Sequence, residues 1–324
     1  MKIKMKTPTF PEILLLVLII CFIVVVFNKF YKRFTNKEGF VERSGDGFVR
    51  KTDEDVFDRF YANMYDDLFY DEDKNNYEIK QILGSDTPQR RRKILDIGCS
   101  TGHHVYLLDH YTRDGDREPS SSVIAQLPSS SVIGIDNSPA MIQKAQKNYP
   151  NLHFKLCDAL NSMAFPAETF THITCLYFTI YYMKDKKQFF ENCYNWLEPG
   201  GVLVLHLVDM HKFDPILPIA DRKSTTESIV HFETLDYKSI FTIDPSIDAT
   251  SVILDKPNAV IRETIKIKEP VKSVRINEHN MYMSSQNSIL GLAKDVGFTL
   301  QSVEEMKDVR YDHNFLYVLQ KTFS

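Results

Sequence analysis

One short run of residues combines an acid with two glycines at a spacing that suits ligand binding. The segment 94–102, ILDIGCSTG, places Asp96 near the end of an apolar run, with Gly98 and Gly102 directly after it. Glycines let the backbone approach a ligand closely, and the carboxyl ends of strands in open α/β sheets form the binding crevice. The pattern therefore predicts a cradle for an adenosyl ligand at a strand-to-helix turn.

Two further acids follow the next two predicted strands. Asp136 ends VIGID, and Asp158 follows HFKLC. A carboxylate in the position of Asp136 can accept hydrogen bonds from both hydroxyls of a ribose. Taken singly, Asp96 could be a helix N-terminal carboxylate, Asp136 could cap the following turn, and the glycines could serve packing. The joint spacing favours one shared binding site over these separate roles.

A regular alternation of strands and helices positions these acids. Strands are expected at 93–97, 132–136, 153–157, 172–176 and 202–208, and helices at 102–111, 138–148 and 185–197. Such alternation predicts a parallel, doubly wound sheet. A helix over 284–296 stops at Gly297, and segments 298–303 and 314–320 are expected to close the chain as an antiparallel hairpin.

Two segments depart from this alternation. Residues 209–284 alternate apolar and polar positions over 229–243, 251–254 and 259–268, which predicts a β-rich insert. Residues 53–77 are acidic and aromatic at near-helical spacing, which predicts one amphipathic helix with a solvated acidic face. Its Tyr61 and Tyr65 either pack in the core or fold over the ligand.

Together these segments resemble the class I S-adenosylmethionine-dependent methyltransferases. The resemblance runs from about residue 53 to the C-terminus, through DIGCSTG, GIDNSPAMI, CDA, the LEPGG turn and the final AKDVGF hairpin. It implies a Rossmann-like sheet and S-adenosyl-L-methionine as the cofactor. By the same resemblance, Asp96, Gly98 and Gly102 would line the methionine portion of the cofactor, with Cys99 between them as a further binding residue.

The resemblance also assigns residues to the nucleoside portion of the cofactor. Asp136 would hold the ribose hydroxyls, Asn137 would flank the adenine, and Asp158 with Ala159 would meet the adenine edge. The sequence departs from the family at Ser100, which stands where the family usually has a middle glycine. This departure concerns the tightness of the turn more than the identity of the cofactor.

The main rival class of enzyme is a dinucleotide-binding dehydrogenase. Its G-x-G-x-x-G pattern is incomplete here, since GCSTG lacks one glycine and has an acid two residues upstream. A nucleic-acid amino-methyltransferase would carry [ND]-P-P-[YF] after the fourth strand, where this chain reads CLYF. The net charge of −4, from 39 Lys+Arg and 43 Asp+Glu, also argues against a nucleic-acid partner.

Methyl transfer is an in-line displacement, so alignment matters most and a base is needed only if the acceptor must lose a proton. The candidates near the cleft mouth are Tyr181, Tyr182 and His206, with lid packing or a satisfied core position as the alternatives. Four residues of the insert could select the substrate, with solvated surface as the alternative: Arg262, Arg275, His279 and Tyr282.

The N-terminus carries the strongest apolar signal of the chain. Residues 13–27 are an unbroken apolar run, and the span 10–31 would reach about 33 Å as a helix, enough to cross a bilayer. A cleaved signal peptide is the main alternative, but no small-x-small cleavage site follows the run. Basic residues on both sides lean only slightly toward a cytosolic C-terminal body, and the absence of an N-x-[ST] sequon agrees.

The whole composition is that of a globular protein, at 324 residues with 43% hydrophobic and 25% charged positions. No two of the five cysteines share a C-x-x-C spacing, so neither a metal site nor a disulfide framework is indicated. We therefore expect a single-pass anchor at 1–31, a linker at 32–52 and a methyltransferase domain at 53–324 with a substrate-binding insert at 209–284.

The expected reaction is methyl transfer from S-adenosyl-L-methionine to a small-molecule or lipid acceptor. Two alternatives remain open, a methyltransferase acting on a protein and a non-catalytic cofactor-binding scaffold. The sequence leaves the acceptor and the oligomeric state undetermined.

Overall fold

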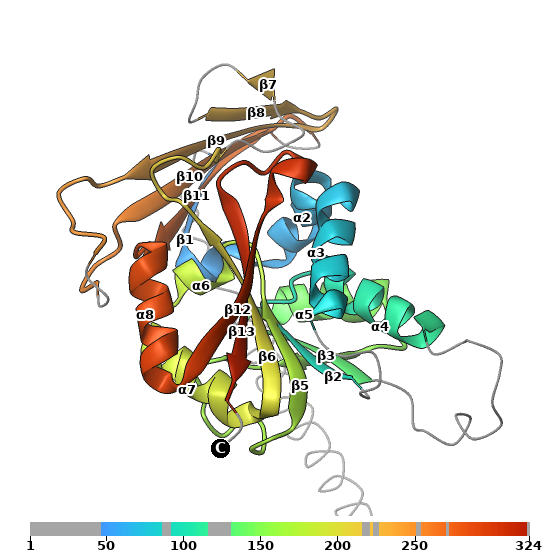
Figure 1. Cartoon of the computed structure of the whole chain (residues 1–324). Helices are drawn as coiled ribbons and strands as arrows, with labels where there is room; N and C mark the ends of the chain where they lie inside the picture. The colour runs from blue at the N-terminus through green and yellow to red at the C-terminus, as the bar shows by residue number, and fades with distance from the viewer. Residues whose placement is uncertain are drawn as a thin grey trace, which may run out of the picture. The chain divides into compact units, whose positions relative to one another are not determined.

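A twisted seven-stranded sheet forms the centre of the fold (Figure 1). The computed structural model describes residues 47–85, 92–115, 131–215, 221–222, 227–250, 254–269 and 272–322. In this sheet the strand order is β12-β13-β6-β5-β2-β3-β4. The bounds are β2 Lys93–Ile97, β3 Ser131–Asp136, β4 His153–Leu156, β5 Phe170–Cys175, β6 Leu197–Val208, β12 Phe298–Glu305 and β13 Asn314–Lys321.

The pairing of these strands confirms the predicted doubly wound sheet. β2 lies parallel to β3 and β5, β3 to β4, and β5 to β6. β13 is antiparallel to both β6 and β12, so the predicted closing hairpin forms one edge of the sheet. Because β2 to β4 are parallel, their carboxyl ends meet at the same edge, where the predicted acids lie.

Helices cover both faces of this sheet. Successive residues of a strand point to opposite faces, so a strand that is apolar throughout needs a cover on each side. In β2, Ile94 packs with the helices α3 and α4, whereas the next residue, Leu95, packs with α7 and α8. The helices are α3 Glu72–Gly84, α4 His103–Gly115, α5 Pro139–Asn148, α6 Thr179–Tyr182, α7 Lys186–Trp196 and α8 Gln286–Val296. Each face of the sheet therefore has its own hydrophobic core.

The acidic, aromatic segment after Thr52 is not the single helix that its spacing predicts. It forms a 3-10 turn η1 at Asp53–Val56, then α2 at Arg59–Phe69, and then α3. Asp58 accepts from the amide of Tyr61, and Asp71 accepts from the amide of Lys74, at 3.1 and 3.0 Å. An aspartate that caps a new helix has extended backbone angles, so each of these two acids interrupts the helical run.

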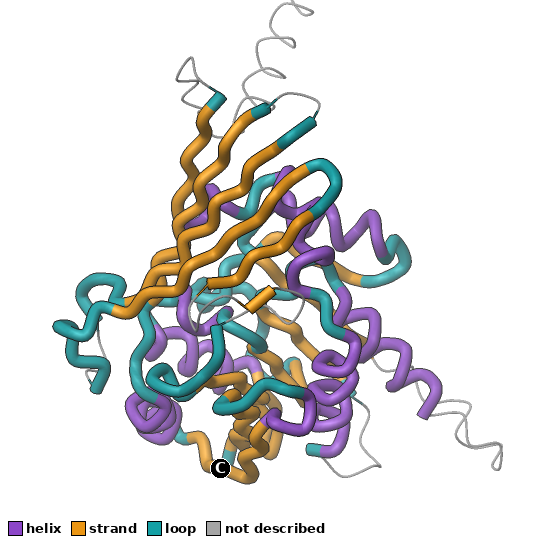
Figure 2. Tube along the Cα trace, turned by 90° about the horizontal axis from the view of Figure 1, so that it is seen from above, coloured by secondary structure: helices purple, strands orange, loops and turns teal. Residues whose placement is uncertain are grey.

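A second sheet of six strands, in the order β1-β11-β10-β9-β8-β7, confirms the predicted β-rich insert. Figure 2 shows its long strands side by side as one curved layer. The bounds are β1 Phe48–Thr52, β7 Asp221–Arg222, β8 Glu227–His231, β9 Leu235–Ile243, β10 Ala259–Ile267 and β11 Ser273–Met281.

Four details of the second sheet differ from the expectation. The strand predicted over 229–243 is a hairpin of β8 and β9, and β11 was not predicted. Residues 48–52, expected in the linker, form β1, which pairs in parallel with β11 at the edge of the sheet. Of the strand predicted over 251–254, residues 251–253 lie outside the described part, and Leu254 is not in a strand.

The described residues all fall within one compact unit, Ser44–Ser324. Among them, no helix is long and apolar enough to span a membrane. The predicted anchor at 1–31 lies outside the described residues, so it stays a prediction.

Candidate functional site

The glycine turn joins β2 to α4 and is held against the end of β3. Gly98 has a backbone φ of +74°, in the left-handed region that favours glycine. A Cβ atom added there would lie 2.5 Å from Cγ2 of Thr179, the first residue of α6. The amides of Gly98 and Cys99 both donate to the carbonyl oxygen of Ile135, at 2.8 and 2.9 Å. The position therefore has no room for a side chain.

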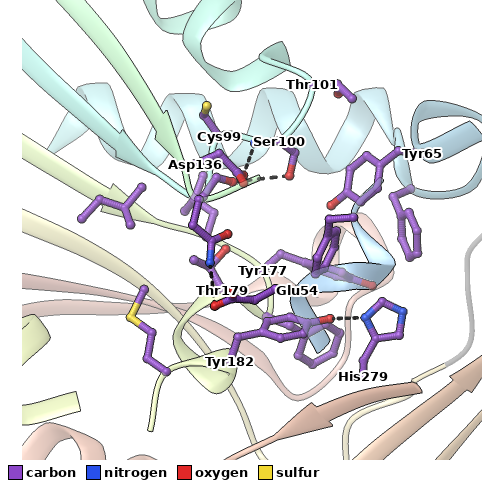
Figure 3. A pocket seen from close by; sticks show the side chains of 18 of the residues that line it. Glu54, Tyr65, Cys99, Ser100, Thr101, Asp136, Tyr177, Thr179, Tyr182 and His279 are labelled. Carbon is purple, nitrogen blue, oxygen red and sulfur yellow. Dashed lines mark hydrogen bonds between the residues drawn. The ribbon is translucent and has the colours of Figure 1, made fainter. Parts of the chain in front are cut away.

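Ser100, which replaces the expected middle glycine, also adopts a left-handed conformation, with a φ of +48°. Its amide nitrogen donates to Oδ2 of Asp136 at 3.1 Å (Figure 3). Left-handed backbone costs a residue with a Cβ atom about 1–2 kcal/mol, so this hydrogen bond helps to hold the conformation. The turn thus keeps its shape without the glycine.

The two acids behind the turn are both desolvated. Burial raises the pKa of Asp136 to about 6, although the amides of Ser138 and Ser100 donate to the carboxylate and act in the opposite direction. Burial likewise raises the pKa of Asp96, whose Oδ1 accepts a 2.7 Å hydrogen bond from the Thr174 hydroxyl. Both carboxyl groups keep lone pairs for further donors, which suits a ligand rich in hydroxyl and amino groups.

These residues face a cavity of about 490 Å³, which also has walls from α2, α6 and the second sheet. The structure brings most of the predicted cofactor residues to its wall: Asp96, Gly98, Cys99, Asp136, Asn137, Asp158 and Ala159. Gly102 does not line the cavity. Its φ is +93°, and an added Cβ would lie 2.8 Å from the ring of Phe154, so it closes the turn by tight packing. The individual cofactor contacts stay predictions.

The three predicted catalytic residues do not share one environment. Tyr182 lines the cavity, and Figure 3 shows its hydroxyl aimed at His279. Tyr181 and His206 are fully buried and do not line the cavity, so their expected place at the cleft mouth is wrong. The Tyr181 hydroxyl accepts a hydrogen bond from the amide of Val208 at 2.9 Å.

His206 has a structural environment of the same kind. Its Nδ1 accepts from the amide of Tyr177 at 3.1 Å, and its Nε2 lies 3.1 Å from Oδ1 of Asn314. Nδ1 also lies 3.4 Å from Oε1 of Glu78, a buried carboxylate. His206 lies on the apolar strand β6, and its side chain points into the core. Its imidazole therefore connects β6 with β13 and α3.

The four candidate residues of the insert divide in the same way. His279 and Tyr282 line the cavity, whereas Arg262 and Arg275 do not. Arg275 is buried and donates to both carboxylate oxygens of Asp58, at 3.0 and 2.8 Å. It therefore fixes the start of α2 against β11.

The most important group that the sequence did not reveal is Glu263, on β10. It is 1% exposed and lines the cavity. Although burial acts to raise its pKa, the charge of His279 and hydrogen bonds from His279, Asn277 and Tyr61 hold the pKa below its usual range. An alternating strand places Glu263 on the inner face, but only the pairing of distant strands shows what it meets there.

A second missed cluster lies beside Asp96. Lys74 and His104 line the cavity and both bind Glu78, at 3.0 and 2.7 Å. Burial acts to raise the pKa of Glu78, but the charge of Lys74 and the hydrogen bonds from His104 and His206 hold it well below its usual range. These cationic and donor groups would suit the carboxylate of an amino-acid ligand. Among the described residues no cluster of three or more metal ligands occurs.

The chemistry of the wall fits the cofactor that the sequence resemblance implies. Asp136 offers acceptors for a ribose, the glycine turn leaves its backbone open, and Lys74 with His104 offers donors for a carboxylate. Aromatic rings from Tyr65 and Tyr177 complete this part of the wall, and aromatic faces favour a sulfonium cation.

Part of the chain is similar to known methyltransferases. Residues 89–241 match a family model described as a methyltransferase domain. Trans-aconitate 2-methyltransferase of Methylobacterium radiotolerans is 25% identical over 138 residues, 43% of this chain and 46% of that protein. Demethylmenaquinone methyltransferase of Chlorobaculum tepidum is 34% identical over 122 residues, 38% of this chain and 41% of that protein. The chain thus spans about half the length of the curated relatives it matches.

Solved structures show the same fold over a larger part of the chain. The CcbJ methyltransferase of Streptomyces caelestis superposes with a TM-score of 0.60 at 14% identity, covering 83% of this chain and 99% of that one. An S-adenosylmethionine-dependent methyltransferase of Clostridium acetobutylicum gives a TM-score of 0.57, also at 14% identity, covering 81% and 98%. Residues 89–241 therefore match a methyltransferase domain, and the chain has the fold of S-adenosylmethionine-dependent methyltransferases of known structure.

Proposed function

We propose that this protein transfers a methyl group from S-adenosyl-L-methionine to a small-molecule acceptor held in the cavity. The main observation in support of the proposal is that two different surfaces face each other across one cavity. One side holds the glycine turn and Asp136, and the other side is an aromatic and acidic surface from α2 and the second sheet. The bound cofactor supplies an activated methyl group, and the chain supplies alignment and exclusion of water.

The charges of the described wall narrow the acceptor class. Seven carboxylates line the cavity, against two lysines: Asp53, Glu54, Asp66, Asp96, Asp136, Asp158 and Glu263, with Lys74 and Lys184. The first of the relatives above is named for trans-aconitate, a tricarboxylate. Such an anion would meet repulsion here, so a neutral or cationic acceptor with an apolar part fits the wall better.

Binding of the cofactor is the first test of this function. In calorimetry on the full chain, Asp96→Ala should weaken the binding of S-adenosylhomocysteine by about 1–3 kcal/mol, through the loss of a charged hydrogen-bond partner. Asp67→Ala is the matched control, because Asp67 is an exposed residue of α2 that does not line the cavity. No heat from the wild type at millimolar ligand contradicts the proposal, and equal affinity of both variants contradicts the assignment of Asp96.

We further infer that residues 10–31 anchor the protein in a membrane, with the catalytic body on the cytosolic side. The support is the apolar run 13–27 and the aromatic and basic residues that flank it. The full chain should sediment with membranes after alkaline washing, and a chain lacking residues 1–31 should not. Release of the full chain by that washing contradicts the anchor, and digestion by a protease added to the non-cytosolic side contradicts the orientation.

An anchored enzyme with aromatic cavity walls raises a second candidate acceptor, a lipid or a quinone. The relative named for demethylmenaquinone, at 34% identity, favours this candidate. If the acceptor is dissolved in the membrane, the rate of methyl transfer should depend on added liposomes. Equal turnover of a soluble acceptor without residues 1–31 would favour the soluble small molecule instead.

A further inference from the structure

A buried chain of three polar side chains crosses the acceptor side of the cavity. Tyr182 ends α6, His279 lies on β11 and Glu263 lies on β10. The Tyr182 hydroxyl lies 2.9 Å from Nδ1 of His279, and Nε2 of His279 lies 3.2 Å from Oε2 of Glu263. All three line the cavity, but Tyr182 is only half-buried, whereas His279 and Glu263 are 2% and 1% exposed.

The partners of Glu263 determine which nitrogen of His279 carries the proton. Oε1 of Glu263 accepts from the hydroxyls of Tyr61 and Tyr237, at 2.6 and 2.7 Å, and Oε2 accepts from the amide of Asn277 at 2.7 Å. These three donors are neutral, and the pKa of the carboxyl is held low, so Glu263 is a carboxylate that can only accept. Nε2 of His279 lies 3.2 Å from Oε2 of this carboxylate, so the contact favours the tautomer of the neutral imidazole that has its proton on Nε2 and an acceptor lone pair on Nδ1.

The Tyr182 hydroxyl then donates its hydrogen bond to Nδ1 of His279. Burial, and after it the negative charge of Glu263, raise the pKa of Tyr182 well above its usual value, so the resting group is the neutral phenol. Among the described residues, its only hydrogen-bond partner is Nδ1 of His279. After Glu263, the groups whose charges act on Tyr182 are the phenols of Tyr65 and Tyr177 and the carboxylate of Asp53, the first residue of η1.

The position of Tyr182 relative to the cofactor cradle is fixed by the backbone. α6 begins at Thr179, whose side chain fills the space beside Gly98, and it ends at Tyr182. The amide of Tyr282 donates to the carbonyl oxygen of Tyr181 at 2.7 Å, and Lys186 donates to the carbonyl oxygen of Tyr282 at 2.7 Å. One short helix thus connects the glycine turn to the end of β11, and its last hydroxyl faces the space between them.

We propose that Tyr182, His279 and Glu263 form a proton relay that deprotonates the acceptor, and that the acceptor is therefore a hydroxyl or an ammonium group. This inference rests on the proposed function. The acceptor O–H or N–H proton passes to the Tyr182 oxygen while the Tyr182 proton passes to Nδ1 of His279. The acceptor lone pair freed in this way forms the new bond to the methyl carbon. The methyl–sulfur bond breaks, and its electron pair stays on sulfur in S-adenosylhomocysteine.

Each member of the relay has a distinct part. Tyr182 touches the acceptor and is the catalytic residue, while His279 and Glu263 act through it and are positioning residues. The imidazolium formed on His279 is stabilised by the Glu263 carboxylate until the proton leaves to water, as in other hydroxyl–imidazole–carboxylate sites. An acceptor that attacks as an already ionised carboxylate has no use for this relay.

The first arm of the test needs no acceptor. In the full chain with bound S-adenosylhomocysteine, ¹⁵N NMR of selectively labelled histidine, assigned with His279→Gln, should show the neutral Nε2–H tautomer of His279. Glu263→Gln should shift the Nδ1 and Nε2 resonances of His279. The control Glu227→Gln, on β8, removes only a partner of Lys238 and should not shift them. A proton on Nδ1 at neutral pH overturns the relay, because Tyr182 could then not donate to it.

The second arm measures transfer from methyl-labelled S-adenosylmethionine, with a dilution series of a metabolite and lipid extract as the acceptor probe. Tyr182→Phe should lower the saturating rate by about 10²–10⁴-fold, with little change in half-saturation or in S-adenosylhomocysteine binding. His279→Gln and Glu263→Gln should also lower the saturating rate. Tyr181→Phe, which loses only the bond to Val208, should keep the wild-type rate.

The two arms separate this inference from the proposed function. Absence of transfer by the wild type, with cofactor binding intact, overturns the proposed function and with it the relay. Transfer by the wild type that Tyr182→Phe retains overturns the relay alone, as does methylation of a carboxylate or a carbon atom in the labelled product.

Discussion

At the scale of the single residue, Asp136 is the predicted contact of the cofactor ribose. It ends β3, accepts from the amides of Ser100 and Ser138, and has a pKa raised by burial to about 6. Ribose hydroxyls that donate to this carboxyl stabilise its charged form, so ligand binding should lower the pKa. The ligand and a proton therefore compete at Asp136.

This competition predicts a pH dependence of cofactor binding. As the pH falls through about 6, free Asp136 becomes protonated, so the affinity for S-adenosylhomocysteine should fall by up to about tenfold per pH unit below that value. Calorimetry at pH 6 in buffers of different ionisation enthalpy should detect a proton released on binding. Asp136→Asn should abolish that release, and Asp67→Asn should leave it unchanged. No release by the wild type contradicts the role of Asp136.

Residue-scale prediction from sequence succeeds where the chemistry is local. Asp96, Gly98 and Asp136 lie in short motifs that also set their own backbone, so their place at one cavity wall could be predicted. Glu263 and His279 are different, because they lie on paired strands and meet through the register that places Glu263 opposite Asn277 and Ile261 opposite His279. No local pattern encodes that register.

At the scale of the element, the wall formed by α2 depends on one buried ion pair. Arg275 on β11 donates to Asp58, which caps α2, and also to the carbonyl oxygen of Val56 at 2.8 Å. Helix periodicity could not reveal this connection, and neither could it reveal the break between α2 and α3. Capping by an aspartate and pairing with a distant arginine together override the continuous apolar spacing of residues 53–77.

Removal of Arg275 should therefore loosen α2 from the second sheet. Arg275→Met removes the bidentate partner of the partly buried Asp58, which keeps only the longer contact with Lys51 at 3.8 Å, and should lower the free energy of unfolding by about 3 kcal/mol. Arg262→Met is the matched control, because Arg262 is exposed on β10 and pairs with Glu278 near the surface, a contact worth about 0–1 kcal/mol. Chemical denaturation of both variants measures the difference. Equal, small losses would show that the pair does not hold α2.

At the scale of the whole molecule, two sheets divide the work of the site. In the proposed function, the seven-stranded sheet provides the cofactor side of the cavity wall, and the six-stranded sheet provides the acceptor side, including Glu263 and His279. The alternation of strands and helices predicted the parallel part of the first sheet and the acids at the ends of its strands. The segments after Gly297 predicted the closing hairpin. The second sheet was predicted only as β-rich, because antiparallel alternation shows which faces are apolar and not which strand pairs with which. The membrane anchor stays a prediction from the apolar run at 13–27.

The central claim is that the cavity between these two sheets transfers a methyl group to a small acceptor. The most direct test incubates the full chain with methyl-labelled S-adenosylmethionine and a cell extract, then separates small molecules, lipids and protein. The account predicts label in the small-molecule fraction, or in the lipid fraction if the acceptor is membrane-dissolved, and its loss with Asp96→Ala but not with Asp67→Ala. Label confined to protein, or no transferred label despite measured binding of the cofactor, would contradict the account.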